Sequence, residues 1–331
     1  MYYNKITTHD DKLFYNNTNY TIHYKNITYI MYYNKITTYD DKLFYNNNLL
    51  PSSLPINLYI NYNTEHTQPT HKKTITKYNL FIFIFNRGNK SGGNYFHFHF
   101  HYLQKLLPFF KLSNIKLALP LNMLDFQKEI LFKLVPKSNI EFLDIYQYNY
   151  EIINAYIGDY ISPNLIPTEL FDIYQNIGSQ YIHNIKNHNI IFIARKNYSH
   201  NAGKNRYIIN NKQLDEFIID NNIIKYYFDD KNLEDKLISL INLNPKIIII
   251  EIGSGITNLL FVPKQYLANI KFIFIDQKCW QLSKSRMYDI IIKLELNHII
   301  ITCVNEIQDY VDIQNNPYYI NLDLLENYIK T

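Results

Sequence analysis

A run of apolar residues that is interrupted by two glycines most constrains the fold of this chain. Residues 246–261 read KIIIIEIGSGITNLLF, so a β-branched segment ends at Gly253 and Gly255 before a second apolar segment begins. This order predicts a buried strand, a tight turn and a helix. Such a turn presents the backbone N–H groups of residues 254–258 at a helix N-terminus, where they favour a phosphate or carboxylate. A plain strand-to-helix connection is the alternative.

Strand and helix patterns alternate along residues 78–331, which is typical of α/β domains with parallel sheets. Fully apolar strands such as 247–250 are expected where helices cover both faces of a sheet. The predicted strands are 78–86, 115–118, 140–143, 190–194, 224–228, 247–252, 270–275 and 299–303. The predicted helices are 102–112, 123–134, 170–182, 212–221, 233–243, 256–261, 284–294 and 322–329. We therefore expect an α/β fold of two facing Rossmann-like domains, at 76–185 and 186–331.

An internal duplication marks the N-terminal segment. Residues 1–17 recur as residues 31–47, with His9 in the first copy and Tyr39 in the second as the difference. Two copies of a polar Tyr/Asn segment are too few for a solenoid. We expect residues 1–75 to be a duplicated Tyr/Asn-rich leader that closes with a Pro/Ser/Thr/His-rich linker. A pair of β-hairpins is the alternative.

Length and composition limit the class of protein. With 331 residues, of which 47% are hydrophobic, the chain is long enough for two domains with buried cores. The net charge of +4 is small and the lysines are scattered, which argues against a nucleic-acid partner. No apolar run reaches the length of a membrane span, and the N-terminus lacks the apolar core of a signal peptide.

The cysteines and the codon bias suggest a location and an origin. Cys279 and Cys303 lie in apolar surroundings, which predicts buried thiols in a reducing compartment. We therefore expect a cytoplasmic protein. Asn, Ile, Lys, Tyr and Phe dominate the sequence, as AT-rich codons would produce. An AT-rich genome such as that of a large DNA virus or a parasite is our hypothesis, and a viral protein would act in the host cytoplasm.

Two cations follow another apolar strand. In an open parallel sheet, ligands bind beyond the carboxyl ends of the strands, so the strands at 190–194 and 247–252 should share one crevice. The first strand is followed by Arg195 and Lys196, and the second by the glycine turn. Two cations opposite a helix N-terminus suit a diphosphate, which the arginine can bind in bidentate fashion. The alternative is that both side chains only solvate a strand end.

The order of these segments resembles that of the catalytic domain of glycosyltransferase family 61, which includes O-GlcNAc, xylan and bacterial polysaccharide glycosyltransferases. The matching segments are IFIAR at 191–195, NRYIIN at 205–210 with Leu214, GSGITN at 253–258 with Phe261, NYFH at 94–97 with Leu103 and Leu106, FQKE at 126–129, and YINLD at 319–323. The resemblance extends from residue 78 to the C-terminus.

The resemblance implies a GT-B fold, in which 76–185 is the acceptor-side domain and 186–331 binds the nucleotide sugar. It implies transfer of a sugar from a nucleotide-sugar donor, such as a UDP-sugar, to a glycan or protein acceptor. Inversion at the anomeric carbon, without a metal, is the expected chemistry. The residues expected at the donor are Arg195, Lys196, Arg206, Gly253, Ser254, Gly255, Thr257 and Asn258.

The same resemblance implies that Asn94 and His97 lie across the cleft from the donor. An inverting enzyme needs a base that takes the proton of the acceptor hydroxyl. The imidazole of His97 suits proton transfer near neutral pH. Because His97, His99 and His101 alternate with aromatic residues, a metal site is an alternative there, but a packed helix start or strand edge is the expected structure.

One position departs from the family pattern. Members of the family usually carry histidine immediately before the first glycine of the loop, where this chain has Ile252. Glu251 is no simple replacement, because neighbouring residues of a strand point to opposite faces. A catalytically degenerate relative that binds nucleotide, or serves a structural role, is therefore one alternative. An S-adenosylmethionine-dependent methyltransferase is another, since Asp276 ends the strand after the glycine turn.

Overall fold

The structure is a computed structural model. It describes residues 20–24, 28–39, 42–45, 48–49, 71–76, 79–83, 94–144, 147–158, 166–182, 189–195, 208–228, 231–277, 287–305 and 317–331. The chain divides into two compact units, residues 1–170 and 171–331. Each unit contains a sheet with parallel strands and helices beside it, so the fold class is α/β. The division falls inside the helix α3 (Thr168–Ser179), whereas the sequence predicted a boundary at 185.

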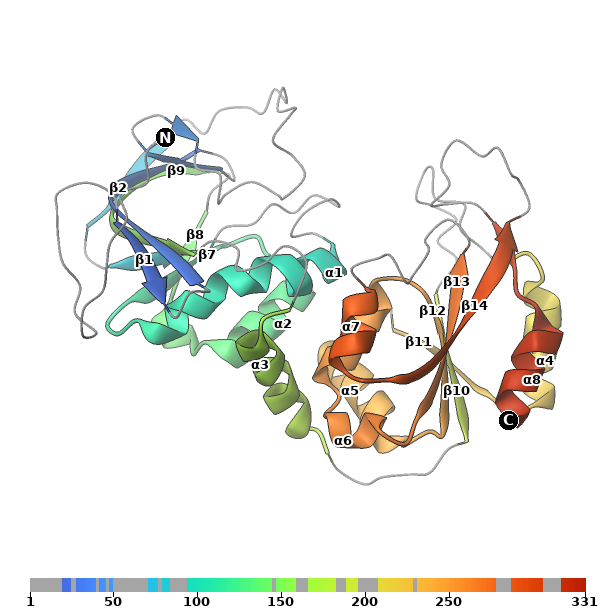
Figure 1. Cartoon of the computed structure of the whole chain (residues 1–331). Coiled ribbons are helices and arrows are strands. Elements are labelled where there is room, and N and C mark those ends of the chain that lie inside the picture. The colour runs from blue at the N-terminus through green and yellow to red at the C-terminus, as the bar shows by residue number, and fades with distance from the viewer. Residues whose placement is uncertain are drawn as a thin grey trace. The chain divides into compact units, whose positions relative to one another are not determined.

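The first unit contains a mixed sheet that curls strongly (Figure 1). Its described strands are β1 (Tyr20–Tyr24), β2 (Thr28–Tyr39), β3 (Lys42–Tyr45), β4 (Asn48–Leu49), β5 (His71–Ile75), β6 (Leu80–Ile82), β7 (Lys116–Pro120), β8 (Ile140–Leu143) and β9 (Tyr148–Gly158). The main path runs β4-β3-β2-β9-β6-β7-β8. Strands β6, β7, β8 and β9 are parallel where they pair, and β2 joins β9 in the antiparallel sense. The parallel part therefore carries the βαβ connections that the alternating pattern predicts.

The duplicated segment contributes strands to this sheet. The second copy, residues 31–47, supplies most of β2 and all of β3, which pair as an antiparallel hairpin. β1 forms a further antiparallel pair with β2. The described part of the second copy therefore forms strands of this sheet. The first copy, residues 1–17, lies outside the described residues.

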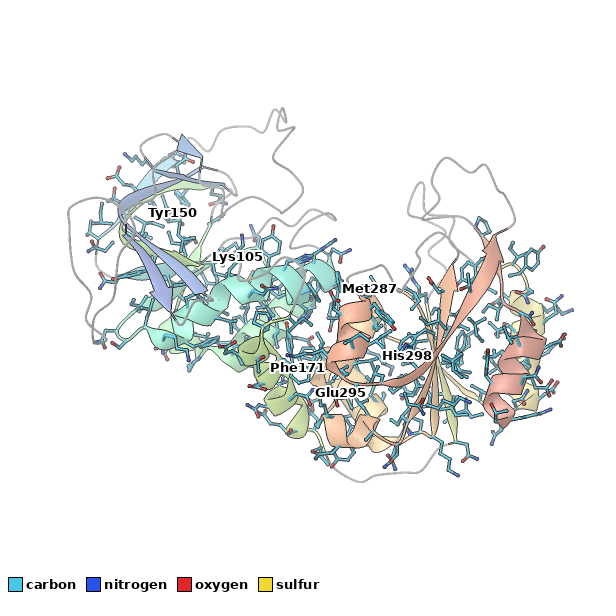
Figure 2. All side chains as sticks on the ribbon, in the orientation of Figure 1. Lys105, Tyr150, Phe171, Met287, Glu295 and His298 are labelled. Atoms are coloured by element: carbon cyan, nitrogen blue, oxygen red, sulfur yellow. The ribbon has the colours of Figure 1, made fainter. Side chains whose placement is uncertain are left out.

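The long strand β9 is the central element of this sheet and was not predicted. One of its edges pairs with β2, and the other pairs with β5 and then with β6. Asn154 has a φ of 57°, the left-handed conformation that asparagine adopts more readily than most residues, and it lies where the partner changes from β5 to β6. Buried Tyr150 and Ile152 contribute to the core beside β6 and β7 (Figure 2).

A continuous helical run connects β6 to β7. It consists of α1 (Tyr95–His97), a π-helical segment η2 (Phe98–Tyr102) and a 3-10 helix η3 (Leu103–Lys111). Pro108 lies within η3, where the missing N–H disfavours regular α-helix. The helix α2 (Asp125–Leu134) and the short η4 (Lys137–Asn139) then connect β7 to β8. The segment predicted as a helix at 102–112 is thus helical up to Lys111, but the helical run begins earlier and is of the π and 3-10 types over this segment, and Leu112 is extended.

The second unit contains a six-stranded sheet within the described residues. Its strands are β10 (Ile190–Ala194), β11 (Ile224–Tyr227), β12 (Ile247–Glu251), β13 (Lys271–Gln277), β14 (Asn297–Asn305) and β15 (Tyr318–Tyr319). The order is β11-β10-β12-β13-β14-β15, and all pairs are parallel except β14 with β15. The first five strands therefore have the order 2-1-3-4-5 of a doubly wound fold.

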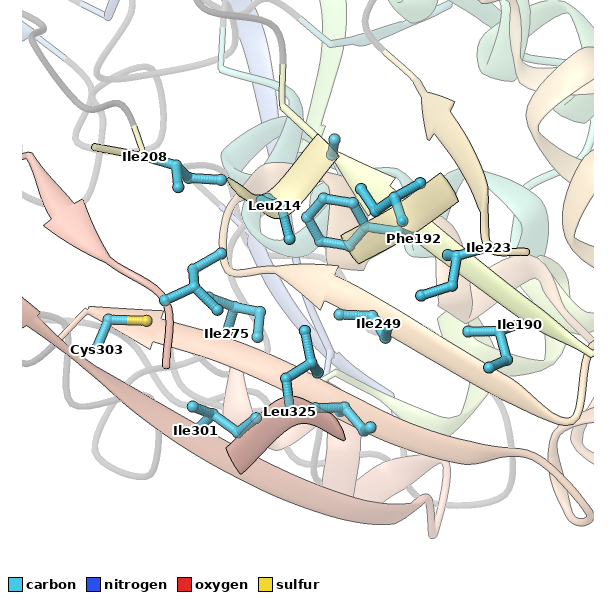
Figure 3. Packing of buried hydrophobic residues seen from close by; sticks show 14 of the residues in the cluster. Ile190, Phe192, Ile208, Leu214, Ile223, Ile249, Ile275, Ile301, Cys303 and Leu325 are labelled. Atoms are coloured by element: carbon cyan, nitrogen blue, oxygen red, sulfur yellow. The ribbon is translucent and has the colours of Figure 1, made fainter. Parts of the chain in front are cut away.

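Helices cover both faces of this sheet (Figure 1). α4 (Asn211–Asp220) and α8 (Leu322–Lys330) lie on one face. α5 (Leu233–Asn242), α6 (Lys264–Leu267), α7 (Tyr288–Lys293) and the 3-10 helix η5 (Ser254–Phe261) belong to the other side. Figure 3 shows the core under α4 and α8, where Phe192, Ile249 and Ile301 pack against Leu214 and Leu325. Burial on both faces explains why these strands are continuous apolar runs.

The buried thiol is confirmed for Cys303, which is part of this core, whereas Cys279 lies outside the described residues. Among the described residues, no helix combines the length and the apolar character needed to cross a membrane.

Candidate functional site

The strand order of the second unit directs attention to the carboxyl ends of β10 and β12. From β10 the chain passes to β11 on one side and then to β12 on the other, so β10 and β12 flank the switch point of the topology. Ile193 is in register with Ile250, which brings the ends of the two strands together. Doubly wound sheets bind their ligands at such a position. Arg195 follows the first strand, and Gly253 lies two residues beyond the second.

Arg195 and Gly253 lie close together at the carboxyl ends of these two strands. A Cβ atom on Gly253 would lie 3.2 Å from Nη1 and 3.4 Å from Cζ of Arg195. The backbone of Gly253 is extended, with φ 173°, a conformation that any residue adopts, so the absent side chain matters here only because it leaves room for the guanidinium to lie against the backbone. Arg195 is exposed, and no ion pair involves it within the described residues. Its charge is therefore accessible to an anion.

The helix η5 begins directly after Gly253. Its first N–H groups, at Ser254 and Gly255, have no acceptor inside a helix that starts there, and both residues are half-buried. Thr257 and Asn258 are only 0% and 1% exposed. The Asn258 amide donates to the carbonyl oxygen of Gly255 at 2.8 Å and so braces the first turn. The accessible part of the predicted loop is therefore Ser254 and Gly255.

The hydroxyl of Thr257 is a second polar group in this turn. Its Oγ1 atom is buried and has no hydrogen-bond partner within the described part of the chain. Buried polar atoms are nearly always paired in folded proteins.

Glu251 contributes a buried carboxylate next to these residues. Its side chain is 7% exposed. One oxygen accepts a hydrogen bond from the backbone N–H of Arg195 at 3.0 Å, and the other accepts from the hydroxyl of Tyr318 at 2.7 Å. Three strand ends, those of β10, β12 and β15, are thus joined through one side chain. The sequence did not predict that Glu251 links these strands, because Tyr318 is distant in the chain and nothing in its surroundings distinguishes it.

Ile252 immediately precedes the first glycine of the turn. Its side chain is fully buried, and its N–H donates to the carbonyl oxygen of Ile275, which continues the ladder to β13. Asp276 lies at the carboxyl end of β13 and is 3% exposed. An acidic side chain in this place, beside a strand that ends in a glycine turn, is a common ligand for ribose hydroxyls.

The predicted catalytic residues lie in the first unit, at the start of its helical run. Asn94 is the N-cap of α1, and its Oδ1 accepts from the backbone N–H of His97 at 3.2 Å. The Asn-x-x-His spacing therefore has a structural function in this fold. Nδ1 of His97 lies 2.9 Å from Nδ1 of His101, and the two rings stack. His99 and His101 are buried, as expected of a packed helix start.

A hydrogen bond between the two Nδ1 atoms requires that one ring carries the proton and donates it while the other ring accepts. Which of the two rings donates depends on their tautomers. Lys196 and Arg206, the remaining residues expected at the donor, lie outside the described residues.

Comparison with known proteins adds no relative. No protein-family model matches this chain, and a search of curated proteins found no match.

Proposed function

We propose that this chain is a nucleotide-sugar-dependent glycosyltransferase, whose second unit binds the donor diphosphate at the switch point between β10 and β12. The observation that carries the proposal is the exposed guanidinium of Arg195 beside Gly253, at the N-terminus of η5. A bidentate guanidinium and the first N–H groups of a helix are complementary to phosphate oxygens. Both the guanidinium and these N–H groups are hydrogen-bond donors, so the group that fits between them is an anion.

In this proposal, the two α/β units correspond to the two Rossmann-like domains of a GT-B enzyme. The donor is a nucleotide sugar such as a UDP-sugar, the acceptor is a glycan or a protein, and transfer proceeds with inversion and without a metal. Arg195, Gly253, Ser254 and Gly255 bind the diphosphate, with Lys196 and Arg206 as further cations. His97 is the proposed base, held by the cap at Asn94 and by its hydrogen bond to His101.

Thermal denaturation with a panel of ligands tests this function. The panel contains nucleoside diphosphates, nucleotide sugars and S-adenosylmethionine. A ligand that binds only the folded state at a hundred times its Kd stabilises it by about 2.7 kcal/mol. We expect such a rise in Tm with one nucleoside diphosphate and its sugar conjugate, and we expect Arg195→Ala to abolish it.

Lys246→Ala is the matched control. Lys246 is an exposed cation at the opposite, amino end of the β12 region, so its removal changes the net charge equally without touching the proposed site. We expect this variant to keep the full rise in Tm. Equal losses in both variants would show that the shift reports only the overall charge and would refute a site at Arg195.

Two other functions have an observation in their favour. The burial of Ile252 in the family's histidine position favours a degenerate relative that binds nucleotide without transfer. Binding without hydrolysis or transfer for any donor, with His97→Ala unchanged, would support it. Asp276 at the end of β13 favours a methyltransferase, and stabilisation by S-adenosylmethionine alone would support that function.

A further inference from the structure

We propose that Glu251 is the positioning residue of the candidate anion site, which it serves by holding the backbone of Arg195 and the hydroxyl of Tyr318. Its expected effect on diphosphate affinity rests on the proposed function. The hydrogen bonds on which the inference is built stand independently of any ligand.

The backbone N–H of Arg195 is held by a side chain of the neighbouring strand. β10 ends at Ala194, so the N–H of Arg195 lies beyond the strand and needs a partner from elsewhere. Oε1 of Glu251 supplies it at 3.0 Å from the neighbouring strand. This bond fixes the point from which the Arg195 side chain departs towards Gly253. The guanidinium position depends on it, because a small rotation of that backbone moves the end of a long side chain by several ångströms.

The other carboxylate oxygen of Glu251 is bound by a tyrosine from β15. The hydroxyl of Tyr318 donates to Oε2 at 2.7 Å, and Tyr318 itself is 1% exposed. Its backbone is tied in turn to the segment before α4, since the N–H of Ile209 donates to the carbonyl of Tyr318 at 2.9 Å. The rotamer of Glu251 is thus determined from both ends. Residues far apart in the sequence set the geometry of the site.

The environment of Glu251 does not suit a direct ligand or a base in place of the missing histidine. Both oxygens already accept a hydrogen bond, and the carboxylate is buried. A carboxylate repels a phosphate group nearby. Direct contact with a phosphate therefore does not explain why a glutamate stands at this position. Its position is explained by the charge-assisted hydrogen bonds that it accepts.

Substitution at Glu251 separates these roles through binding of UDP and of inorganic diphosphate. Glu251→Leu removes both acceptors, and we expect a loss of at least tenfold in affinity. Glu251→Gln keeps an acceptor for Arg195 and a polar partner for Tyr318 without the charge, so we expect affinity equal to or tighter than that of the wild type. Tyr318→Phe removes one of the two bonds, and we expect a loss of a fewfold. A Glu251→Leu protein that binds as tightly as the wild type, or a Glu251→Gln protein as weak as Glu251→Leu, would overturn the inference.

A measurement without ligand keeps the inference testable if Glu251→Leu folds poorly or if the proposed function is wrong. Arg87, Arg195, Arg206 and Arg286 are the arginines of the chain, so selective ¹⁵N-arginine labelling gives a simple amide spectrum. We expect the Arg195 amide proton to resonate downfield and exchange slowly in the wild type and in Tyr318→Phe, and to lose both properties in Glu251→Leu. An Arg195 signal indifferent to Glu251 would refute the inference. Absence of UDP binding by the wild type would refute only the proposed function.

Discussion

A single glycine illustrates how tightly α3 packs against the helix that follows the candidate site. A Cβ atom on Gly178 would lie 1.5 Å from the carbonyl oxygen of Phe261, the last residue of η5. The ring of Tyr174 contacts the ring of Phe261, with centroids 4.6 Å apart. Backbone atoms on both sides leave no flexible group to move aside. The position of η5 is therefore set by contact with α3.

Gly178→Ala tests this packing. In an isolated helix, alanine is more favourable than glycine by about 1 kcal/mol. We expect the opposite here, a loss of at least about 2 kcal/mol in the free energy of unfolding, because the added methyl group overlaps a backbone oxygen. Gly255→Ala is the control, since its Cβ would meet only Phe228 at 3.9 Å. Chemical denaturation that ranks Gly255→Ala as the more damaging change would contradict the packing.

Tyr150 gives a prediction about alkaline pH. Burial raises the pKa of its phenol, and this outweighs the opposing effect of the Asp144 N–H, which donates to the hydroxyl oxygen at 3.0 Å. The folded state therefore keeps a proton that the unfolded state releases above about pH 10. The stabilisation is complete below that pH and is lost as the pH rises, by up to about 1.4 kcal/mol per pH unit.

We expect the stability of Tyr150→Phe to fall less steeply than that of the wild type between pH 10 and pH 11, apart from a constant offset for the lost hydrogen bond. Urea denaturation at a series of pH values measures both slopes. Parallel curves for the two proteins would mean that Tyr150 has the same pKa in the folded and unfolded states.

At the scale of elements, one glutamine fastens α3 to the turn between η5 and α6. The Gln175 amide donates to the carbonyl oxygens of Leu260 at 2.7 Å and Val262 at 3.0 Å, and its Oε1 accepts from the N–H of Lys264 at 2.9 Å. All hydrogen-bonding groups of the turn that face Gln175 are thereby satisfied.

We expect Gln175→Leu to cost about 2–4 kcal/mol, because it leaves three backbone groups without partners. Ser179→Ala is the control, since the Ser179 hydroxyl only returns to the Gln175 carbonyl of its own helix and is exposed. The two variants are compared by urea denaturation. A Gln175→Leu protein as stable as Ser179→Ala would show that water replaces the glutamine at no cost.

The sequence was sufficient to predict most elements of the second unit. The strand at 190–194 was placed to the residue, and β11, β12 and the helices α4, α5 and α8 to within one residue at each end. Each of these strands is an apolar run that helices cover on both faces, so local pattern and burial agree. The approach of Arg195 to Gly253 also followed from topology, because both residues come after parallel strands.

What the sequence did not predict depends on distant partners. β9 was missed because its asparagines and tyrosines obscure the apolar alternation, and its strand conformation depends on pairing with β2, β5 and β6. β15 is two residues long, which is too short to show an alternation of apolar and polar residues. The bonds of Glu251 to Arg195 and Tyr318 join three segments, and no local pattern encodes such a meeting.

At the scale of the molecule, the second unit contains all parts of the proposed diphosphate site among the described residues. Its sheet, the core under α4 and α8, and the contact of α3 with η5 are all made by residues after 170. A domain with its own core can fold alone. We expect a fragment of residues 166–331 to unfold cooperatively and to bind the same nucleoside diphosphate as the whole chain. A fragment without a cooperative transition would show that the unit depends on residues before 166.

The central claim is that a nucleoside diphosphate binds at the switch point between β10 and β12. Hydrogen–deuterium exchange of the whole protein, with and without UDP or whichever diphosphate raises its Tm, tests that claim most directly. We predict protection of peptides that cover 190–195 and 251–258. We predict no protection in 243–247 and 268–271, at the amino ends of β12 and β13. Arg195→Ala should remove the protection. Protection confined to other segments, by a diphosphate that demonstrably binds, would contradict the account.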